Sequence, residues 1–143
     1  MSRPSPLPLS AFPHLTEITT RWMDNDVYGH VNNAVYYSFF DTTVSGYLIQ
    51  TGAVDFASST VIGLAVESKC SYFAPIAFPD RVRGGLKVGH LGNSSVRYDV
   101  GIFRNDEQAA SAQGYFVHVY VDRATNKPVQ LPDKLKAALA KLV

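Results

Sequence analysis

One segment of the 143-residue chain gathers side chains that can do chemistry, and its sequence is Asp24-Asn25-Asp26-Val27-Tyr28-Gly29-His30-Val31-Asn32-Asn33. Carboxylates can act as nucleophiles or general bases, and imidazole and amide groups can orient water or bind a carbonyl. Burying such groups costs free energy unless each is hydrogen-bonded. A polar cluster directly before an aromatic-rich segment therefore indicates a functional site.

The spacing within this cluster excludes several familiar sites. It begins like a calcium loop, but Tyr28 and Val35 stand at the fifth and twelfth positions, where oxygen ligands are needed. The Asp-x-Asp pair also opens phosphatase motifs, which need a parallel doubly wound fold that this chain does not encode. No glycine-rich phosphate loop and no Gly-x-Ser-x-Gly turn is present.

With Cys70 as the single cysteine, neither a disulfide within the chain nor a multi-cysteine zinc site can form, and we expect no metal and no cofactor. Cys70 itself is expected to serve packing.

The hydrophobic pattern predicts the elements that must position the cluster. β-Branched residues favour a strand over 15–22, and apolar residues at helical spacing predict a buried helix over 34–50. Alternation with a period of two predicts four strands, and a short amphipathic helix ends the chain; these segments are 64–73, 81–88, 96–103, 115–121 and 131–142. Segregated helices and strands predict an α+β fold with an antiparallel sheet around one long helix. We expect a proline-rich, flexible or extended segment over 1–13 and one domain over 14–143.

Charge and hydropathy limit the classes of partner. Thirteen Lys and Arg against twelve Asp and Glu give a net charge of +1, which predicts no bulk attraction to nucleic acid or to an anionic membrane. No apolar run is long enough to cross a bilayer, and the first residues do not form a signal peptide. We therefore expect a soluble cytoplasmic protein.

The cluster and the order of elements resemble the hotdog-fold acyl-CoA thioesterases, in particular the 4-hydroxybenzoyl-CoA thioesterase group. The resemblance is carried by Asp24-x-Asp26-x-x-Gly29-His30-Val31-Asn32-Asn33 leading into Tyr36, and more weakly by residues 71–75, 78–80 and 91–95. It implies an antiparallel sheet wrapped around a helix, an acyl-CoA substrate, and subunits joined edge to edge with active sites between them. A homodimer or a tetramer built from two dimers is expected. Asn33 stands where related enzymes often have Tyr or His, and the Gly-His-Val-Asn-Asn form looks more like the long-chain and general branch.

By this resemblance, Asp26 is the catalytic carboxylate, acting either as a nucleophile or as a general base on water. Asp24 either tunes Asp26 or, as we favour, holds the loop. Gly29 permits a tight turn or a close approach of substrate to the backbone. His30 and Asn33 either orient water and thioester or cap the helix, and capping is the favoured role of Asn32.

The resemblance also implies groups that bind the rest of the substrate. Backbone N–H groups around Ser58, Ser59 and Thr60 should receive the negative charge that develops on the thioester oxygen. Tyr36, with other aromatic residues of the 34–50 helix, either lines the acyl pocket or belongs to the core. Cationic candidates for the phosphates of CoA are Arg81, Arg83, Lys87, His90 and Arg97, and the alternative for each is an ordinary solvated face of the sheet.

Hydrolysis of an acyl-CoA thioester is the leading prediction. Two alternatives stay open: a hotdog hydratase or dehydratase that uses His30 and Asp26, and a domain that binds acyl-CoA without turning it over. Release of free thiol distinguishes hydrolysis from both.

Overall fold

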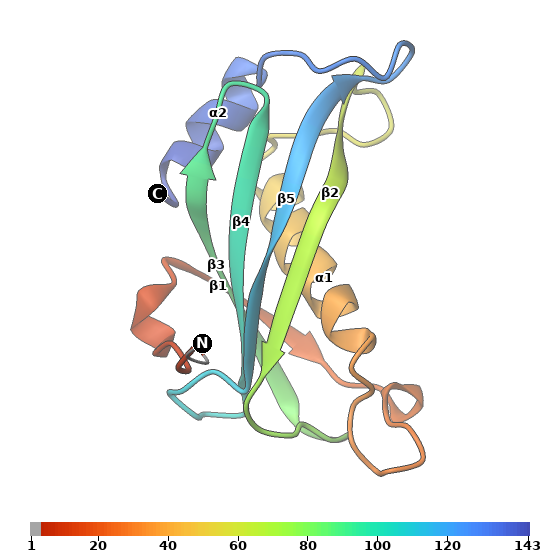
Figure 1. Cartoon of the computed structure of the whole chain (residues 1–143), viewed down its shortest axis with the longest axis vertical. Coiled ribbons are helices and arrows are strands. Elements are labelled where there is room, and N and C mark those ends of the chain that lie inside the picture. The colour runs from red at the N-terminus through yellow and green to blue at the C-terminus, as the bar shows by residue number, and fades with distance from the viewer. Residues whose placement is uncertain (1–3) are drawn as a thin grey trace.

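A five-stranded antiparallel sheet is wrapped around one long helix in the computed structural model, which describes residues 4–143 (Figure 1). The strands follow the order β1-β3-β4-β5-β2 across the sheet. Their bounds are β1 His14–Thr19, β2 Val61–Tyr72, β3 Arg81–Leu91, β4 Ser95–Arg104 and β5 Ala112–Asp122. The helices are α1 Val35–Gln50 and α2 Asp133–Ala140, and the short 3-10 turns are η1 Leu9–Ala11 and η2 Trp22–Asp24. The predicted α+β hotdog fold is confirmed.

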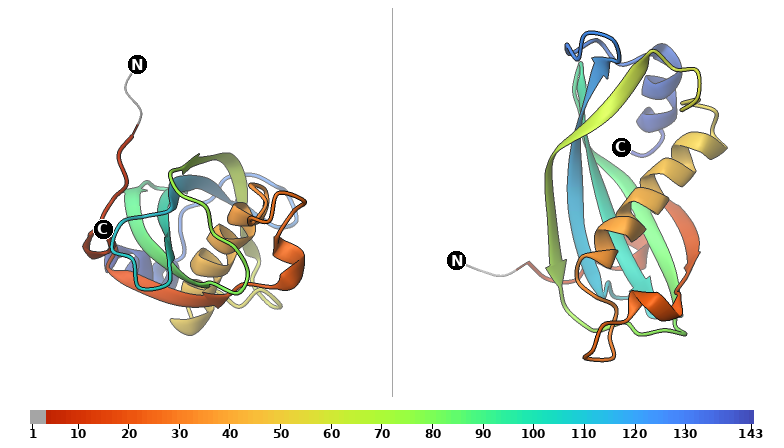
Figure 2. Two further views of the ribbon diagram at one scale, coloured as in Figure 1. Left: turned by 90° about the horizontal axis from the view of Figure 1, so that it is seen from below. Right: turned by 90° about the vertical axis from the view of Figure 1, so that its right-hand side faces the viewer.

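Helix α1 packs across the concave face of the sheet, as the right-hand view of Figure 2 shows. Phe40 and Val44 on this helix are fully or almost fully buried against the strands. Gly84 of β3 lies beneath the helix, where a Cβ atom would collide with the Thr43 side chain. The absence of a side chain at Gly84 therefore lets α1 approach the sheet closely. Helix α2 closes one end of this core, and the Tyr47 hydroxyl of α1 donates a hydrogen bond to the carbonyl of Ala138.

The segment before β1 lies on the opposite face of the sheet from α1 (Figure 2). Phe12 is 5% exposed and packs edge to face on Phe103, over a surface that glycine residues of β3 and β4 leave open. The N–H of Leu9 donates to the carbonyl of Gln108 at 2.8 Å. Long-range contacts that the local sequence pattern does not reveal thus involve residues 7–12 of the proline-rich segment. Residues 1–3 lie outside the described chain.

Strand β2 departs from the predicted pattern of one buried face. Its residues 63–69 are exposed, and they include Leu64 at 41% and Val66 at 62% exposure. The physical reason is its position, because β2 is the last strand of the sheet and pairs only with β5. Apolar side chains that suit a covered strand thus lie on an open edge.

Among residues 4–143, no helix combines the length and the apolar character needed to cross a membrane.

Candidate functional site

The polar cluster forms a compact loop between β1 and α1, and Asp24 anchors its start. The Asp24 side chain is 1% exposed and accepts hydrogen bonds from the backbone N–H of Arg21 at 2.7 Å and from the Arg21 guanidinium at 3.0 Å. These bonds close the 3-10 turn η2 and end the predicted strand at Thr19, earlier than expected. Asp24 therefore holds the loop, as favoured from the sequence, and it does not share an extended face with Asp26.

Asp26 lies at the centre of the loop with both carboxylate oxygens held. Its Oδ1 accepts the N–H of Tyr28 at 2.9 Å, and its Oδ2 accepts the side-chain amide of Asn32 at 3.1 Å. Backbone bonds between Asp26 and His30, and between Asp26 and Gly29, close the turn. Gly29 adopts a φ of 81°, in the left-handed region that other residues rarely occupy. The carboxylate is partly exposed, so it can meet a ligand in a defined orientation.

Asn32 links this carboxylate to the start of α1. Its Oδ1 accepts the N–H of Ala34 at 2.9 Å, and its backbone carbonyl accepts the N–H of Val35. The N-cap position itself is Ala34, which makes no side-chain capping bond. The predicted capping role of Asn32 is therefore corrected in detail, because Asn32 orders the turn that leads into the helix and does not occupy its N-cap. His30 and Asn33 are exposed and do not cap the helix either.

A groove of about 330 Å³ opens next to the loop. Its lining residues are His30, Val31, Asn33, Tyr36, Tyr72, Phe73, Ala74 and Pro75. The Tyr72 hydroxyl donates to the backbone carbonyl of Asn33 at 3.0 Å, which joins the end of β2 to the start of α1. Burial raises the pKa of Tyr36 to about 12, so its hydroxyl is neutral at physiological pH. The structure thus places His30, Asn33 and Tyr36 around one groove, and Asp26 lies on the adjoining loop.

Ser59 and Thr60 lie far from this groove within one chain, because they precede β2 and the groove lies at its end. The N–H groups of Ser58 and Ser59 both donate to the carbonyl of Asp55. The Thr60 carbonyl accepts the N–H of Arg123, but the Thr60 N–H has no acceptor within residues 4–143. Thr60 therefore presents the one unengaged amide among these three residues.

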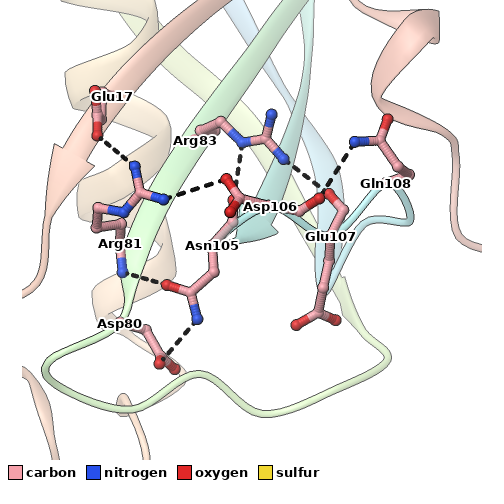
Figure 3. Close-up of polar contacts among 8 residues, drawn as sticks. All are labelled: Glu17, Asp80, Arg81, Arg83, Asn105, Asp106, Glu107 and Gln108. Carbon is pink, nitrogen blue, oxygen red and sulfur yellow. Dashed lines mark hydrogen bonds and ion pairs between the residues drawn. The ribbon is translucent and has the colours of Figure 1, made fainter.

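The cationic candidates for CoA binding are spread along β3 and do not form one cluster. Figure 3 shows Arg81 between Glu17 and Asp106, each at 3.2 Å, and Arg83 donating to backbone carbonyls of the β4–β5 loop. Both arginines therefore brace this loop in the isolated chain. Lys87 lies over the ring of Phe12, which belongs to the segment before β1, and His90 is exposed at the end of the strand.

Arg97 of β4 lies on the same outer face as Lys87. Its guanidinium pairs with Asp99 at 2.9 Å and covers the ring of Tyr115.

A second hollow, a cavity of about 400 Å³, was not predicted from the sequence. It lies between the middle and end of α1, the start of β2 and the end of β5, and its polar lining includes Asp41, His118, Tyr120 and Arg123. Burial raises the pKa of Asp41 and lowers that of His118. The alternation in β5 predicts a strand, but only the tertiary fold shows that His118 and Tyr120 point to the helix side.

Cys70 is half-buried, and burial raises the pKa of its thiol to about 11, which keeps it protonated at neutral pH. This agrees with the packing role expected from the sequence. Within the described part of the chain, no group of three or more His, Cys, Asp or Glu side chains lies close enough together to hold a metal ion.

Comparisons with known proteins agree with this architecture. The family model of the thioesterase-like superfamily matches residues 20–139. The crystal structure of the PA5185 protein from Pseudomonas aeruginosa strain PAO1 superposes with a TM-score of 0.94 at 51% identity, covering 97% of this chain and 96% of that one. A 1,4-dihydroxy-2-naphthoyl-CoA thioesterase from Synechocystis has the same fold, with a TM-score of 0.81 at 17% identity over 90% of this chain and 96% of that one. The Bacillus subtilis protein YsmA is 22% identical over 130 residues, which are 91% of this chain and 87% of YsmA.

Proposed function

The chain belongs to the thioesterase-like superfamily, and from this premise we propose that it hydrolyses an acyl-CoA thioester to a free acid and CoA, with Asp26 as the catalytic carboxylate. The observation that carries the proposal is the fixed orientation of Asp26. Each of its oxygens accepts one hydrogen bond, from the Tyr28 N–H and from the Asn32 amide. The remaining lone pairs are available to a water molecule or to the thioester carbon.

Two routes fit this geometry. In the first, Asp26 takes a proton from water, and the resulting hydroxide attacks the carbonyl carbon. In the second, a carboxylate oxygen attacks directly, and water then hydrolyses the mixed anhydride. In either route the thiolate of CoA leaves and takes up a proton. The exposed side chains of His30 and Asn33 lie at the groove, where they can orient the water or the thioester.

We propose that a partner subunit supplies the donor for the developing oxyanion. Strand β2 has an open edge with exposed Leu64 and Val66, which supports pairing with a second copy of the chain. In an antiparallel pair of β2 strands related by a two-fold axis, the start of one strand lies beside the end of the other. The unengaged N–H of Thr60 would then approach the partner's groove beside Tyr72. Ser59 would shape the same turn.

The CoA moiety requires cations for its phosphates. Arg81 and Arg83 would have to exchange their present partners to bind them, whereas Lys87 and His90 have no carboxylate partner within residues 4–143. The Synechocystis neighbour is a thioesterase that acts on a CoA ester, which supports a CoA thioester as the substrate class here.

The decisive experiment measures thiol release from a panel of aliphatic and aromatic acyl-CoAs by the parent protein and by Asp26→Asn. Loss of a general base or nucleophile should lower kcat about 10²- to 10⁴-fold. Asp133→Asn, in the exposed first turn of α2, is the matched control and should hydrolyse at the parent rate. Circular dichroism should show that both variants are folded.

Other outcomes distinguish the alternatives. A folded Asp26→Asn variant with the parent rate would exclude Asp26 as the catalytic carboxylate. Consumption of an enoyl-CoA without free thiol would indicate a hydratase, and tight binding of acyl-CoA without turnover would indicate a binding domain.

A further inference from the structure

The unpredicted cavity has the composition of a ligand pocket. Most of its wall is apolar, and this part consists of Val44, Leu48, Val54, Phe56, Val61 and Ile62. The polar residues that interrupt this wall are Asp41, Ser45, Ser59, His118, Tyr120 and Arg123, of which His118 and Tyr120 belong to β5. Apolar walls with a small number of placed polar groups are typical of sites for small organic ligands. At about 400 Å³ the cavity is larger than the groove beside Asp26.

The wall formed by β5 carries hydrogen-bonding capacity that the protein does not use. The hydroxyl groups of Tyr98 and Tyr120 lie 2.6 Å apart, and both residues are at most 3% exposed. One hydroxyl donates to the other, so the second hydroxyl proton has no acceptor among residues 4–143. The ring nitrogens of His118 likewise have no hydrogen-bond partner in the described chain, although aromatic rings surround the imidazole. Burial lowers the pKa of His118, so the ring is neutral at physiological pH and offers one donor and one acceptor.

Gly63 of β2 brings the backbone close to these groups. A Cβ atom at this position would lie 3.0 Å from the Tyr120 ring and 3.2 Å from Nδ1 of His118. The strand therefore closes the cavity directly over the two polar side chains. A ligand that fills the cavity must offer an atom that pairs with these groups, because it displaces the water that could otherwise reach them.

The cavity and Asp26 lie at opposite ends of one protomer. Leu48 of the cavity is about 20 Å along α1 from its first residue, by the helical rise of 1.5 Å per residue. The cavity also includes the first residues of β2, whereas the groove beside Asp26 includes the last. In the edge-to-edge pair proposed above, the start of one β2 lies beside the end of the other. The cavity of one protomer thus adjoins the Asp26 loop of its partner.

Resting on the proposed function, we propose that this cavity receives the acyl group and that His118 and Tyr120 select acyl groups with a neutral oxygen at their far end, a hydroxyl or a carbonyl. The thioester carbon then lies at the partner's Asp26, and the acyl group extends away from it toward β5. Asp41 and Arg123 also line the cavity, one of each charge. Neither the neutral imidazole nor the neutral phenol supplies a charge that would compensate a desolvated carboxylate, whereas both can hydrogen-bond to a neutral oxygen.

The test compares kcat/KM for two matched substrate pairs: a straight-chain acyl-CoA with its ω-hydroxy counterpart, and benzoyl-CoA with 4-hydroxybenzoyl-CoA. The parent should prefer the hydroxylated member of at least one pair, and the pair that shows the preference identifies whether the acyl group is linear or aromatic. His118→Phe and Tyr120→Phe remove the polar atoms with little change in shape. Each should lower kcat/KM for the preferred hydroxylated substrate about tenfold and leave its unsubstituted partner within about twofold, as expected for one neutral hydrogen bond.

His118→Gln restores a donor and an acceptor and should recover part of the preference. Tyr115→Phe, on the opposite face of the same strand, removes an exposed hydroxyl and should change neither pair. Equal loss for both members of each pair in the His118 and Tyr120 variants, or a parent with no preference, overturns the proposed selectivity while Asp26-dependent hydrolysis stands. Absence of thiol release from every substrate instead overturns the proposed function. In that case, the dissociation constants of the same four CoA esters still test whether the cavity binds the acyl group. If each ester had the same dissociation constant for the parent and for His118→Phe, the proposed acyl site would be overturned.

Discussion

The amide of Asn32 donates a hydrogen bond to Oδ2 of Asp26 at 3.1 Å, while the amide oxygen of the same side chain accepts the N–H of Ala34. One carboxamide therefore fixes the orientation of the candidate catalytic carboxylate and the turn into α1. Because the two roles share a side chain, the position of Asp26 is coupled to the start of the helix that carries the core.

This coupling makes Asn32 a positioning residue. Asn32→Ala should lower kcat about tenfold, because Asp26 loses one of its two donors and samples other orientations, while KM changes little. The free energy of unfolding should fall by about 1 kcal/mol, from the lost hydrogen bonds. Steady-state kinetics and urea denaturation measure the two effects. A drop in stability with kcat unchanged would show that Asn32 serves the turn alone.

Asp24 should contribute to the stability of the fold and not to catalysis. Asp24→Ala removes a buried carboxylate that holds the backbone and side chain of Arg21, so we expect a loss of about 2 kcal/mol of stability. The activity per folded molecule should stay near that of the parent, because Asp24 does not face the groove. Urea denaturation monitored by tryptophan fluorescence measures the first effect, and a thiol-release assay measures the second. A stable but inactive variant would give Asp24 a part in the chemistry.

At Gly29, the backbone conformation should limit substitution, whereas the space for a side chain should not. No atom lies within 4 Å of the position that a Cβ would occupy, yet φ is 81°. Gly29→Ala should therefore cost about 1–2 kcal/mol from the left-handed backbone alone. Gly29→Asn should cost less, because asparagine tolerates this region better. Equal stability of all three proteins in thermal denaturation would contradict the strained turn.

The open edge of β2 predicts self-association. Val66→Lys places a charge at the middle of this edge and should convert the proposed dimer to a monomer, as measured by light scattering after size exclusion. Activity should fall with it, because the Thr60 amide of one subunit would no longer reach the groove of the other. Lys134→Glu, at an exposed position of α2, serves as a charge-change control and should stay dimeric. A parent protein that is monomeric and fully active would exclude the shared site.

The partly buried imidazole of His118 predicts a specific dependence of stability on pH. Its pKa in the folded chain lies below the 6.5 of an unfolded histidine, because burial disfavours the charged form. The unfolded state therefore binds more protons as the pH falls below 6.5, and the free energy of unfolding decreases. His118→Phe should flatten this decrease between pH 7 and 5, whereas Tyr115→Phe should not. Parallel stability curves for the parent and His118→Phe in urea titrations would contradict the assignment.

The sequence by itself determined the order of the elements, the antiparallel α+β architecture and the loop that carries Asp26. These features depend on local rules, namely the period of apolar residues and hydrogen bonds between groups a few positions apart. The bonds from Tyr28 and Asn32 to Asp26 span two and six residues, so the motif contains its own geometry.

Only the tertiary structure decided which groups from distant segments meet. In the folded chain, Phe12 packs on the outer face of the sheet, and Arg81 and Arg83 form polar contacts with the β4–β5 loop. Strand β2 lies at an open edge of the sheet. The tertiary structure also brought Asp41 of α1 and His118 of β5 to one cavity across 77 positions of sequence. Alternation along a strand shows which residues share a face, but the order of strands and the crossing of the helix decide what each face meets. That order depends on burial summed over the whole chain, which no local pattern contains.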